Sequence, residues 1–320
     1  MTDWKGDEGI RIGLIDVDGH NFPNLPLMKL SAWHRRQGDT VEWYVPSLHS
    51  WPNLPFDKVY MSKVFSFTPD FEYHVNAYQV VRGGSGYCID LVEGKEVYQA
   101  DRDTLLPAEI EHIYPDYSIY PNLTRSTAYG FLSRGCPRGC EFCHVAAKEG
   151  KCSVKVANLR EFWGGQDNIC LCDPNILACR DGEDLLGQLT ESRAVVDFNQ
   201  GIDVRLTTPE RIEMLNRMRI KRIHLAWDNP DQDLKEDFKR FSECYNRKSE
   251  SGKVVYVLTN FGSTIEQDLY RIYTLRDLHF DPYVMIYDKE NADQTHKDMQ
   301  RWVNGREIWR TVRRFEDYIT

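Results

Sequence analysis

The strongest constraint on the fold is the alternation of short apolar runs with amphipathic stretches along nearly the whole chain. Short apolar runs are typical of buried strands, and stretches with apolar residues three or four positions apart are typical of helices. Where the two alternate, the strands usually pair in parallel and the helices cover the sheet. We therefore predict an α/β protein built on parallel sheets.

The first third of the chain carries four strand-like runs. They lie at residues 10–17, 40–45, 58–63 and 79–81. A helix is predicted over residues 27–37, and Gly38 stands where glycine commonly ends a helix. This pattern predicts a small open sheet, Rossmann-like in the broad sense, over residues 1–110.

A second series of strands and helices follows an ordered, proline-containing connector at residues 111–125. Its strands are predicted at residues 128–133, 169–172, 195–198, 222–227, 254–259 and 283–287. Its helices are predicted at residues 156–162, 183–192, 209–218, 234–247 and 264–278. This series predicts a (β/α)6 partial TIM barrel over residues 126–290, because a complete barrel would need further strands.

Charge and hydropathy disfavour two classes of partner. The formal net charge is −9, which is unfavourable for a protein whose main task is to neutralise nucleic-acid phosphates. No stretch approaches the roughly 20 continuous apolar residues of a membrane span, and residues 1–10 lack the basic and apolar regions of a secretory signal. We expect a cytoplasmic protein with no membrane partner and no strong signal for a nucleic-acid partner.

The chain has nine cysteines, and an odd number without a secretory signal favours metal or redox chemistry over disulfides. Three of them, Cys136, Cys140 and Cys143, stand in the run GCPRGCEFC. The glycines and the proline of this run disfavour a helix, so that the three thiolates can converge on one metal centre. Three thiolates suit an iron–sulfur cubane with one open iron, whereas clusters that only transfer electrons usually have four cysteine ligands.

Other roles for the cysteines stay open. Cys152 could be the fourth ligand of a structural zinc ion, although zinc sites typically use two short pairs of ligands separated by a longer loop. Cys170 and Cys172 alternate along one predicted strand, and Cys179 follows them. These three suit either an auxiliary cluster or small buried thiols.

Polar residues follow five of the predicted barrel strands, where barrel enzymes place their chemistry. They are Asp173 and Asn175, then Asn199, Gln200, Asp203 and Arg205, then Asp228 and Asn229, then Asn260, and finally Tyr287 and Asp288. Each alone is equally typical of a helix N-cap or a turn. As a set, they predict a polar site at the carboxyl ends of the barrel strands.

The run GCPRGCEFC after a strand, followed by five further strand–helix units, resembles the radical S-adenosylmethionine (radical SAM) superfamily over about residues 126–288. The resemblance implies that Cys136, Cys140 and Cys143 hold a 4Fe–4S cluster whose fourth iron is chelated by SAM. It also implies that one electron, from a flavodoxin- or ferredoxin-like reductant, splits SAM into methionine and a 5′-deoxyadenosyl radical. This radical would abstract hydrogen from a substrate, a small molecule, peptide or nucleotide that no motif identifies.

The resemblance also indicates which residues bind SAM. Phe142, the aromatic residue before the last cysteine, is expected near the adenine. The Gly-Gly-Glu-like segment of the family is replaced here by LCDPN, similar to the Asp-containing second strand of cobalamin-type members, which makes Asp173 a candidate. Gln200, Asp203 and Asn229 are the other candidates for cofactor contacts, and no catalytic residue is singled out.

The first domain resembles the cobalamin-binding domain that precedes the barrel in one branch of this superfamily. The similar positions are Asp18-Gly19-His20 after the first strand, Ser62 after the third and Gly83-Gly84 after the fourth. The resemblance implies cobalamin as a further cofactor, with His20 as a cobalt ligand. Pro23 stands where that family has glycine, so a degenerate domain that shapes the substrate entrance is the alternative.

The segment at residues 291–320 predicts a C-terminal helical cap. Trp302, Trp309, Val312 and Phe315 suit an amphipathic helix packed on the barrel. The arginines among them would instead suit a nucleic-acid surface, on which aromatic side chains stack against bases.

The main functional hypothesis is therefore a radical SAM enzyme that abstracts hydrogen from an unidentified substrate. The first alternative is a cobalamin-dependent radical SAM methyltransferase. The second alternative is a non-catalytic metal-binding module.

Overall fold

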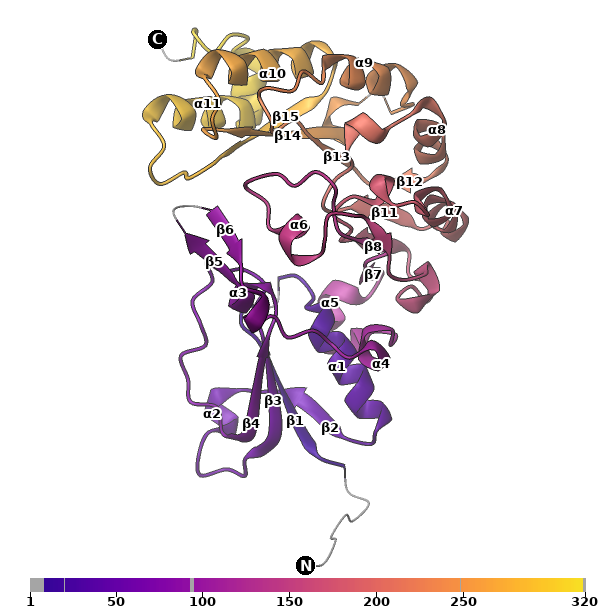
Figure 1. The fold of residues 1–320 in the computed structure, drawn as a ribbon, viewed down its shortest axis with the longest axis vertical. Helices are drawn as coiled ribbons and strands as arrows, with labels where there is room; N and C mark the ends of the chain where they lie inside the picture. The colour runs from indigo at the N-terminus through magenta and orange to yellow at the C-terminus, as the bar shows by residue number, and fades with distance from the viewer. Residues whose placement is uncertain (1–8, 20, 93–94, 248, 319–320) are drawn as a thin grey trace, which may run out of the picture. The chain divides into compact units, whose positions relative to one another are not determined.

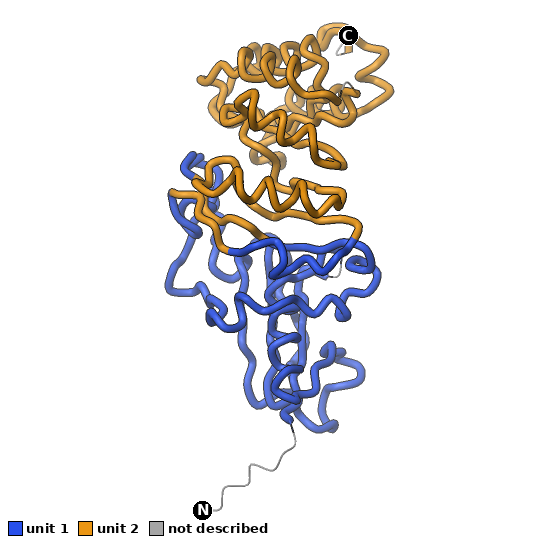
Figure 2. The backbone as a smooth tube through the Cα atoms, turned by 90° about the vertical axis from the view of Figure 1, so that its right-hand side faces the viewer, with its two compact units in different colours: residues 1–130, 137–151, 157–166 blue, residues 131–136, 152–156, 167–320 orange. Residues whose placement is uncertain are grey.

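The computed structural model describes residues 9–19, 21–92, 95–247 and 249–318. The chain divides into two compact units (Figure 2). The first unit holds residues 1–130, 137–151 and 157–166, and the second holds residues 131–136, 152–156 and 167–320. No helix in the described ranges is long and apolar enough to cross a membrane.

A four-stranded parallel sheet forms the centre of the first unit (Figure 1). Its strands are β1 (Arg11–Asp16), β2 (Thr40–Trp43), β3 (Phe56–Ser62) and β4 (Ala77–Gly83), in the order β2-β1-β3-β4. Helix α1 (Leu25–Arg36) packs Leu27 against Ile12 of β1. It begins earlier than predicted because Asn24 caps it, accepting a hydrogen bond of 3.2 Å from the amide of Leu27. The predicted open parallel sheet is confirmed.

The rest of the first unit consists of short elements. They are α2 (Pro46–His49), α3 (Ser85–Cys88), α4 (Ala108–Glu111), α5 (Pro121–Thr124), β7 (Thr127–Gly130) and an antiparallel hairpin of β5 (Ile89–Val92) and β6 (Lys95–Tyr98). The hairpin is not among the predicted elements because most of its side chains are exposed, which weakens the apolar alternation that marks a strand.

Parallel strands and covering helices also build the second unit. Strands β10 (Asn168–Leu171), β11 (Val195–Phe198) and β12 (Arg219–Ile220) pair in one parallel sheet, and β13 (Ile223–Ala226), β14 (Lys253–Thr259) and β15 (Asp281–Ile286) pair in another. The helices between them are α7 (Gly182–Ser192), α8 (Pro209–Arg217), α9 (Lys235–Cys244) and α10 (Ile265–Asp277). The alternation predicted from the sequence is confirmed, and the count of six strands in one partial barrel stays a prediction.

One predicted element of the barrel region is confirmed only in part, and another is wrong. The run at residues 128–133 is not one strand, because β7 ends before β8 (Ser133–Arg134), which pairs with β9 (Val154–Lys155) in antiparallel fashion. The helix predicted at residues 156–162 is only a 3₁₀ turn over Leu159–Glu161, capped by Asn158. Two glycines follow at 164 and 165, after Phe162 and Trp163, and glycine weakens any helix that would continue through them.

The C-terminal segment packs through its aromatic side chains. Helix α11 (Gln294–Asn304) is followed by α12 (Arg306–Thr311). Trp302 is 0% exposed, and its ring centroid lies 5.0 Å from that of Trp309 and 5.5 Å from that of Phe315. The guanidinium of Arg276, on α10, stacks 3.2 Å over the Trp309 ring. These contacts support the amphipathic cap, since the aromatic rings face other side chains of the second unit.

Replacing Trp302 with alanine should remove this anchor. We expect Trp302→Ala to lower the free energy of unfolding by about 3–5 kcal/mol, because it leaves a large cavity in a buried cluster. Urea denaturation followed by tryptophan fluorescence and circular dichroism measures the loss. Trp51→Ala is the matched control, since Trp51 is 83% exposed, and equal midpoints for the two variants would contradict the prediction.

Candidate functional site

The cysteine run lies in a loop between β8 and the short helix α6 (Val145–Lys148). Gly135 and Gly139 adopt φ angles of 87° and 59°, in the left-handed region that residues with a side chain rarely adopt. The amide of Cys143 donates a hydrogen bond of 3.0 Å to the carbonyl oxygen of Cys140. The run therefore folds as successive turns and not as a helix.

The three cysteines of this loop are accessible. Cys140 is exposed, Cys136 and Cys143 are partly exposed, and none of them forms a disulfide. Cys136 belongs to the second unit, whereas Cys140 and Cys143 belong to the first. No group of three His, Cys, Asp or Glu side chains within the described ranges is arranged to hold a metal ion. The convergence of the three thiolates on one cluster therefore stays a prediction.

In the first unit, the hairpin of β5 and β6 holds the segment that carries Cys140 and Cys143. His144 Nδ1 lies 2.6 Å from the carboxylate of Glu96 on β6, and this hydrogen bond lowers the pKa of Glu96. Lys148 Nζ donates to Ser85 Oγ at 2.8 Å. The segment after the last cysteine is thus tied to its own unit at two points, one on the hairpin and one on α3, and the sequence predicted neither element.

In the second unit, the carboxylate of Asp173 fixes the start of the cysteine loop. It follows β10 and accepts hydrogen bonds from the amide of Leu132 (2.9 Å), the amide of Ser133 and the hydroxyl of Ser133 (2.6 Å). Burial raises the pKa of Asp173 to about 6, while these donors act in the opposite direction. Both carboxylate oxygens are engaged with the chain just before Cys136, so the structure gives Asp173 a positioning role, and its predicted contact with a cofactor stays a prediction.

Asn175 connects Cys136 to the loop after β11. Its Nδ2 donates to Cys136 Sγ at 3.7 Å and to Asp203 Oδ2 at 3.3 Å. Arg205 Nε donates in turn to Asp203 Oδ1 at 2.7 Å, and Arg205 Nη1 reaches Gln232 Oε1 at 2.8 Å. The structure therefore brings together Cys136 and Asp203 from the predicted set, with Asn175 between them.

The other predicted cofactor residues lie on the loops after β8, β11 and β13. Gln200 is exposed in the loop after β11, and Phe142 is partly exposed in the cysteine loop. Asn229 is exposed, and its Oδ1 accepts a hydrogen bond of 2.8 Å from the amide of Asp231. That contact makes Asn229 a turn former at the end of β13.

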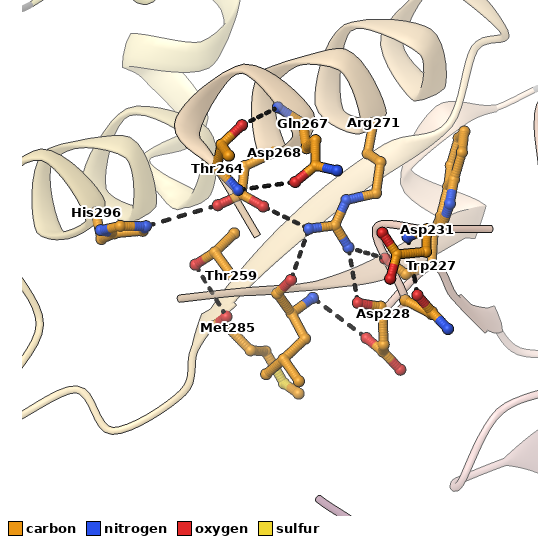
Figure 3. Close-up of polar contacts among 12 residues, drawn as sticks. Trp227, Asp228, Asp231, Thr259, Thr264, Gln267, Asp268, Arg271, Met285 and His296 are labelled. Atoms are coloured by element: carbon orange, nitrogen blue, oxygen red, sulfur yellow. Dashed lines mark hydrogen bonds and ion pairs between the residues drawn. The ribbon is translucent and has the colours of Figure 1, made fainter. Parts of the chain in front are cut away.

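A buried arginine on α10 organises the strand ends of the second sheet (Figure 3). Arg271 donates to the carbonyl oxygens of Trp227, Asp228 (3.0 Å) and Leu258 (2.8 Å), and forms an ion pair with Asp268. Arg271 is 1% exposed and Asp268 is 0% exposed. Burial lowers the pKa of Arg271 and raises that of Asp268. The arginine thus ties the ends of β13 and β14 to α10.

Neither the Arg271 contacts nor the hairpin contacts were predicted from the sequence. The signal for the first is an Asp and an Arg three positions apart on one face of a helix, Asp268 and Arg271, where neighbours in space are expected. Such pairs are common on exposed helices, so the spacing alone does not indicate burial.

Three further cysteines lie in the interior of the second unit. Cys170, Cys172 and Cys179 are buried. The pKa of Cys172 is raised by its hydrogen bond to Cys170 and by burial, and burial raises the pKa of Cys179. Their burial supports packing as small apolar side chains. Cys152 is exposed, and neither an auxiliary cluster nor a zinc site is tested by its placement.

At the carboxyl edge of the first sheet, the cobalamin-like positions are occupied by contacts within the chain. Asp18 accepts hydrogen bonds from the amides of Val64 and Phe65 (3.2 Å). Ser62 Oγ accepts from Asn24 Nδ2 at 2.8 Å. A Cβ at Gly84 would lie 2.3 Å from the carbonyl oxygen of Lys63. Asp18, Ser62 and Gly84 are thus engaged with other parts of the first unit, and His20 lies outside the described residues.

A pH dependence of stability follows from the partly buried carboxyl of Asp228, whose Oδ1 accepts a hydrogen bond from the amide of Leu258 at 3.2 Å. Burial raises its pKa from 3.8 to about 6. The folded state therefore binds a proton at Asp228 more readily than the unfolded state does. The contribution of Asp228 to the free energy of unfolding is complete below about pH 4 and is lost as pH rises through about 6, a change of roughly 3 kcal/mol. Asp228→Asn, which keeps an acceptor at Oδ1, should show a smaller decrease in unfolding free energy between pH 4 and 7 than the wild type.

Denaturant unfolding at a series of pH values measures this difference. Asp231→Asn is the control, because Asp231 is exposed on the same loop. A decrease of equal size in wild type and Asp228→Asn would show that Asp228 does not carry the effect.

Comparison with known proteins shows what this fold is similar to. No family model and no curated protein matches the sequence. Among solved structures, the fold is similar to that of a radical S-adenosylmethionine methyltransferase, TsrM, from Kitasatospora setae, with cobalamin and a [4Fe-4S] cluster bound. The TM-score is 0.62 and the identity 12%, over 87% of this chain and 75% of that chain. The chain therefore shares its fold with a radical SAM methyltransferase.

Proposed function

We propose that this protein is a radical SAM enzyme that cleaves S-adenosylmethionine reductively and abstracts hydrogen from a substrate. The observation that carries the proposal is the cysteine run of residues 135–143, placed directly after β8 in a fold similar to that of a radical SAM methyltransferase. Neither part is sufficient alone, since a cysteine motif can hold other metals and a fold does not determine a function.

The residues present fit a 4Fe–4S cluster on three counts. Cys136, Cys140 and Cys143 are at least partly exposed, as ligands to an external group must be. Glycines with positive φ at 135 and 139 let the loop turn between these ligands. Asn175 Oδ1 is buried next to Cys136 and has no hydrogen-bond partner within the described residues, so a donor on SAM bound at the cluster would satisfy it.

The division of work follows from these residues. When bound, the cluster supplies one electron for the cleavage of SAM into methionine and a 5′-deoxyadenosyl radical. Asp173 holds the backbone ahead of Cys136, and the contacts of His144 and Lys148 hold the segment after Cys143. Holding a reactive centre in a fixed place against one C–H bond is the protein's main contribution to such chemistry.

The remaining roles are part of the proposal. Phe142, Asp173, Gln200, Asp203 and Asn229 are the proposed cofactor contacts. Asp203 is supported by its link to Cys136 through Asn175. A flavodoxin- or ferredoxin-like protein is the proposed electron donor. The substrate is a small molecule, peptide or nucleotide.

Replacing any one of the three motif cysteines should abolish the activity. After anaerobic reconstitution with iron and sulfide, we expect the wild type to bind about four iron atoms per chain and to form 5′-deoxyadenosine from SAM with dithionite. Cys136→Ala, Cys140→Ala and Cys143→Ala should each lose the product by at least about 100-fold, because loss of a ligand at a metal centre costs this order or more. Iron analysis and chromatographic quantification of 5′-deoxyadenosine measure both quantities.

Cys244→Ala is the matched control, since Cys244 is also exposed but lies outside the motif. It should keep both iron and product. Metal binding without SAM cleavage in the wild type would instead support the non-catalytic metal-binding module.

A second candidate is cobalamin-dependent methyl transfer, which is favoured by the methyltransferase and the bound cobalamin named for the structural neighbour. The engaged positions at Asp18, Ser62 and Gly84 do not favour it. We expect protein purified from cells supplied with hydroxocobalamin to show no corrinoid absorbance, because Asp18 and Ser62 are already engaged in hydrogen bonds within the chain. A stoichiometric corrinoid spectrum, with two SAM consumed per product, would replace hydrogen abstraction by methyl transfer as the proposed reaction.

A further inference from the structure

The side chain of Asn175 lies in a position to act on one of the motif thiolates. The residue is 3% exposed and sits between β10 and a 3₁₀ turn over Ile176–Ala178. Its backbone carbonyl accepts a hydrogen bond of 3.2 Å from the amide of Ala178. Its Nδ2 reaches Cys136 Sγ at 3.7 Å, a distance typical of a hydrogen bond to sulfur. The amide is therefore held beside the first cysteine of the motif by buried backbone.

The orientation of this amide is determined by Asp203. Its Oδ2 accepts from Asn175 Nδ2 at 3.3 Å, and its Oδ1 is held by both the Nε (2.7 Å) and the backbone amide (3.2 Å) of Arg205. A flipped amide would place Asn175 Oδ1 against the carboxylate, where two acceptors repel each other. The two N–H groups of Nδ2 therefore point to Asp203 and to Cys136.

An N–H donor to a ligand sulfur has a known effect on an iron–sulfur cluster. It withdraws electron density from the thiolate and stabilises the reduced cluster, which carries more negative charge. The carboxylate of Asp203 acts in the opposite direction, because a negative charge near the cluster stabilises the oxidised form. The two side chains thus act on the reduction potential with opposite signs.

We infer that Asn175 is a positioning residue that raises the reduction potential of the cluster through its hydrogen bond to Cys136. This inference rests on the proposed function. Asp203 orients the amide and opposes its effect through its charge. The pair balances how readily the cluster accepts an electron from the reductant.

The test measures the cluster itself and not the activity. Full-length wild type, Asn175→Leu, Asp203→Asn and Asn216→Ala are reconstituted anaerobically, and iron is determined per chain. The midpoint potential is then measured without SAM by a redox titration followed by electron paramagnetic resonance. Leucine keeps the approximate size of asparagine without its donor. Asn216 is the control, because its amide donates to the carbonyl oxygen of Cys244 at 3.0 Å, away from the strand ends.

We expect the midpoint potential of Asn175→Leu to lie below that of the wild type, that of Asp203→Asn to lie above it, and that of Asn216→Ala to equal it. If Asn175→Leu binds the cluster and has the midpoint potential of the wild type, the inference is overturned and the proposed function is left intact. If Asn175→Leu holds no cluster, the further variant Asn175→Ala, which also lacks the donor, decides, and the wild-type potential there overturns the inference. Wild type that binds no iron would contradict the proposed function and this inference together.

Discussion

The buried carboxylate of Asp173 is the contact on which the arrangement of the candidate site depends. It stands at the end of β10 and binds the amides of Leu132 and Ser133, about forty positions earlier in the chain. Burying a carboxylate costs free energy unless hydrogen-bond donors surround it. The buried Asp173 therefore keeps the amides of Leu132 and Ser133 in place beside it. Because the cysteine loop begins directly after Ser133, the position of Cys136 follows from this contact, and Asn175 is brought beside it by the same turn.

In the second sheet of the same unit, a buried side chain of the opposite charge also binds backbone near the strand ends. Arg271 on α10 is surrounded by three backbone carbonyl oxygens and the carboxylate of Asp268. Removing one partner of such a buried pair leaves an uncompensated charge, which costs more than an exposed pair contributes. In both places, a buried charged group joins loops that leave the carboxyl ends of parallel strands, which is the edge where α/β proteins bind ligands.

Much of the fold could be predicted because strand runs and amphipathic helices leave local patterns. Strands β11 and β14 and helices α7 and α8 lie close to their predicted ranges. The failures have physical causes as well. The apolar run at 128–133 turns at Leu132, whose amide bonds to Asp173, and the hairpin of β5 and β6 buries too little to show strand alternation. The motif cysteines were recognisable from spacing, whereas Asn229 forms its own turn.

The sequence by itself determined the parallel α/β architecture and the turned loop of Cys136, Cys140 and Cys143, because both depend on residues close together in the chain. Only the tertiary structure decided which partner each polar side chain takes. Asp173 binds backbone ahead of the loop, and Asn175 is oriented by Asp203 from the next strand. The physical reason is that a buried polar group must find a partner, and the partner is supplied by distant segments that only folding brings within hydrogen-bond distance.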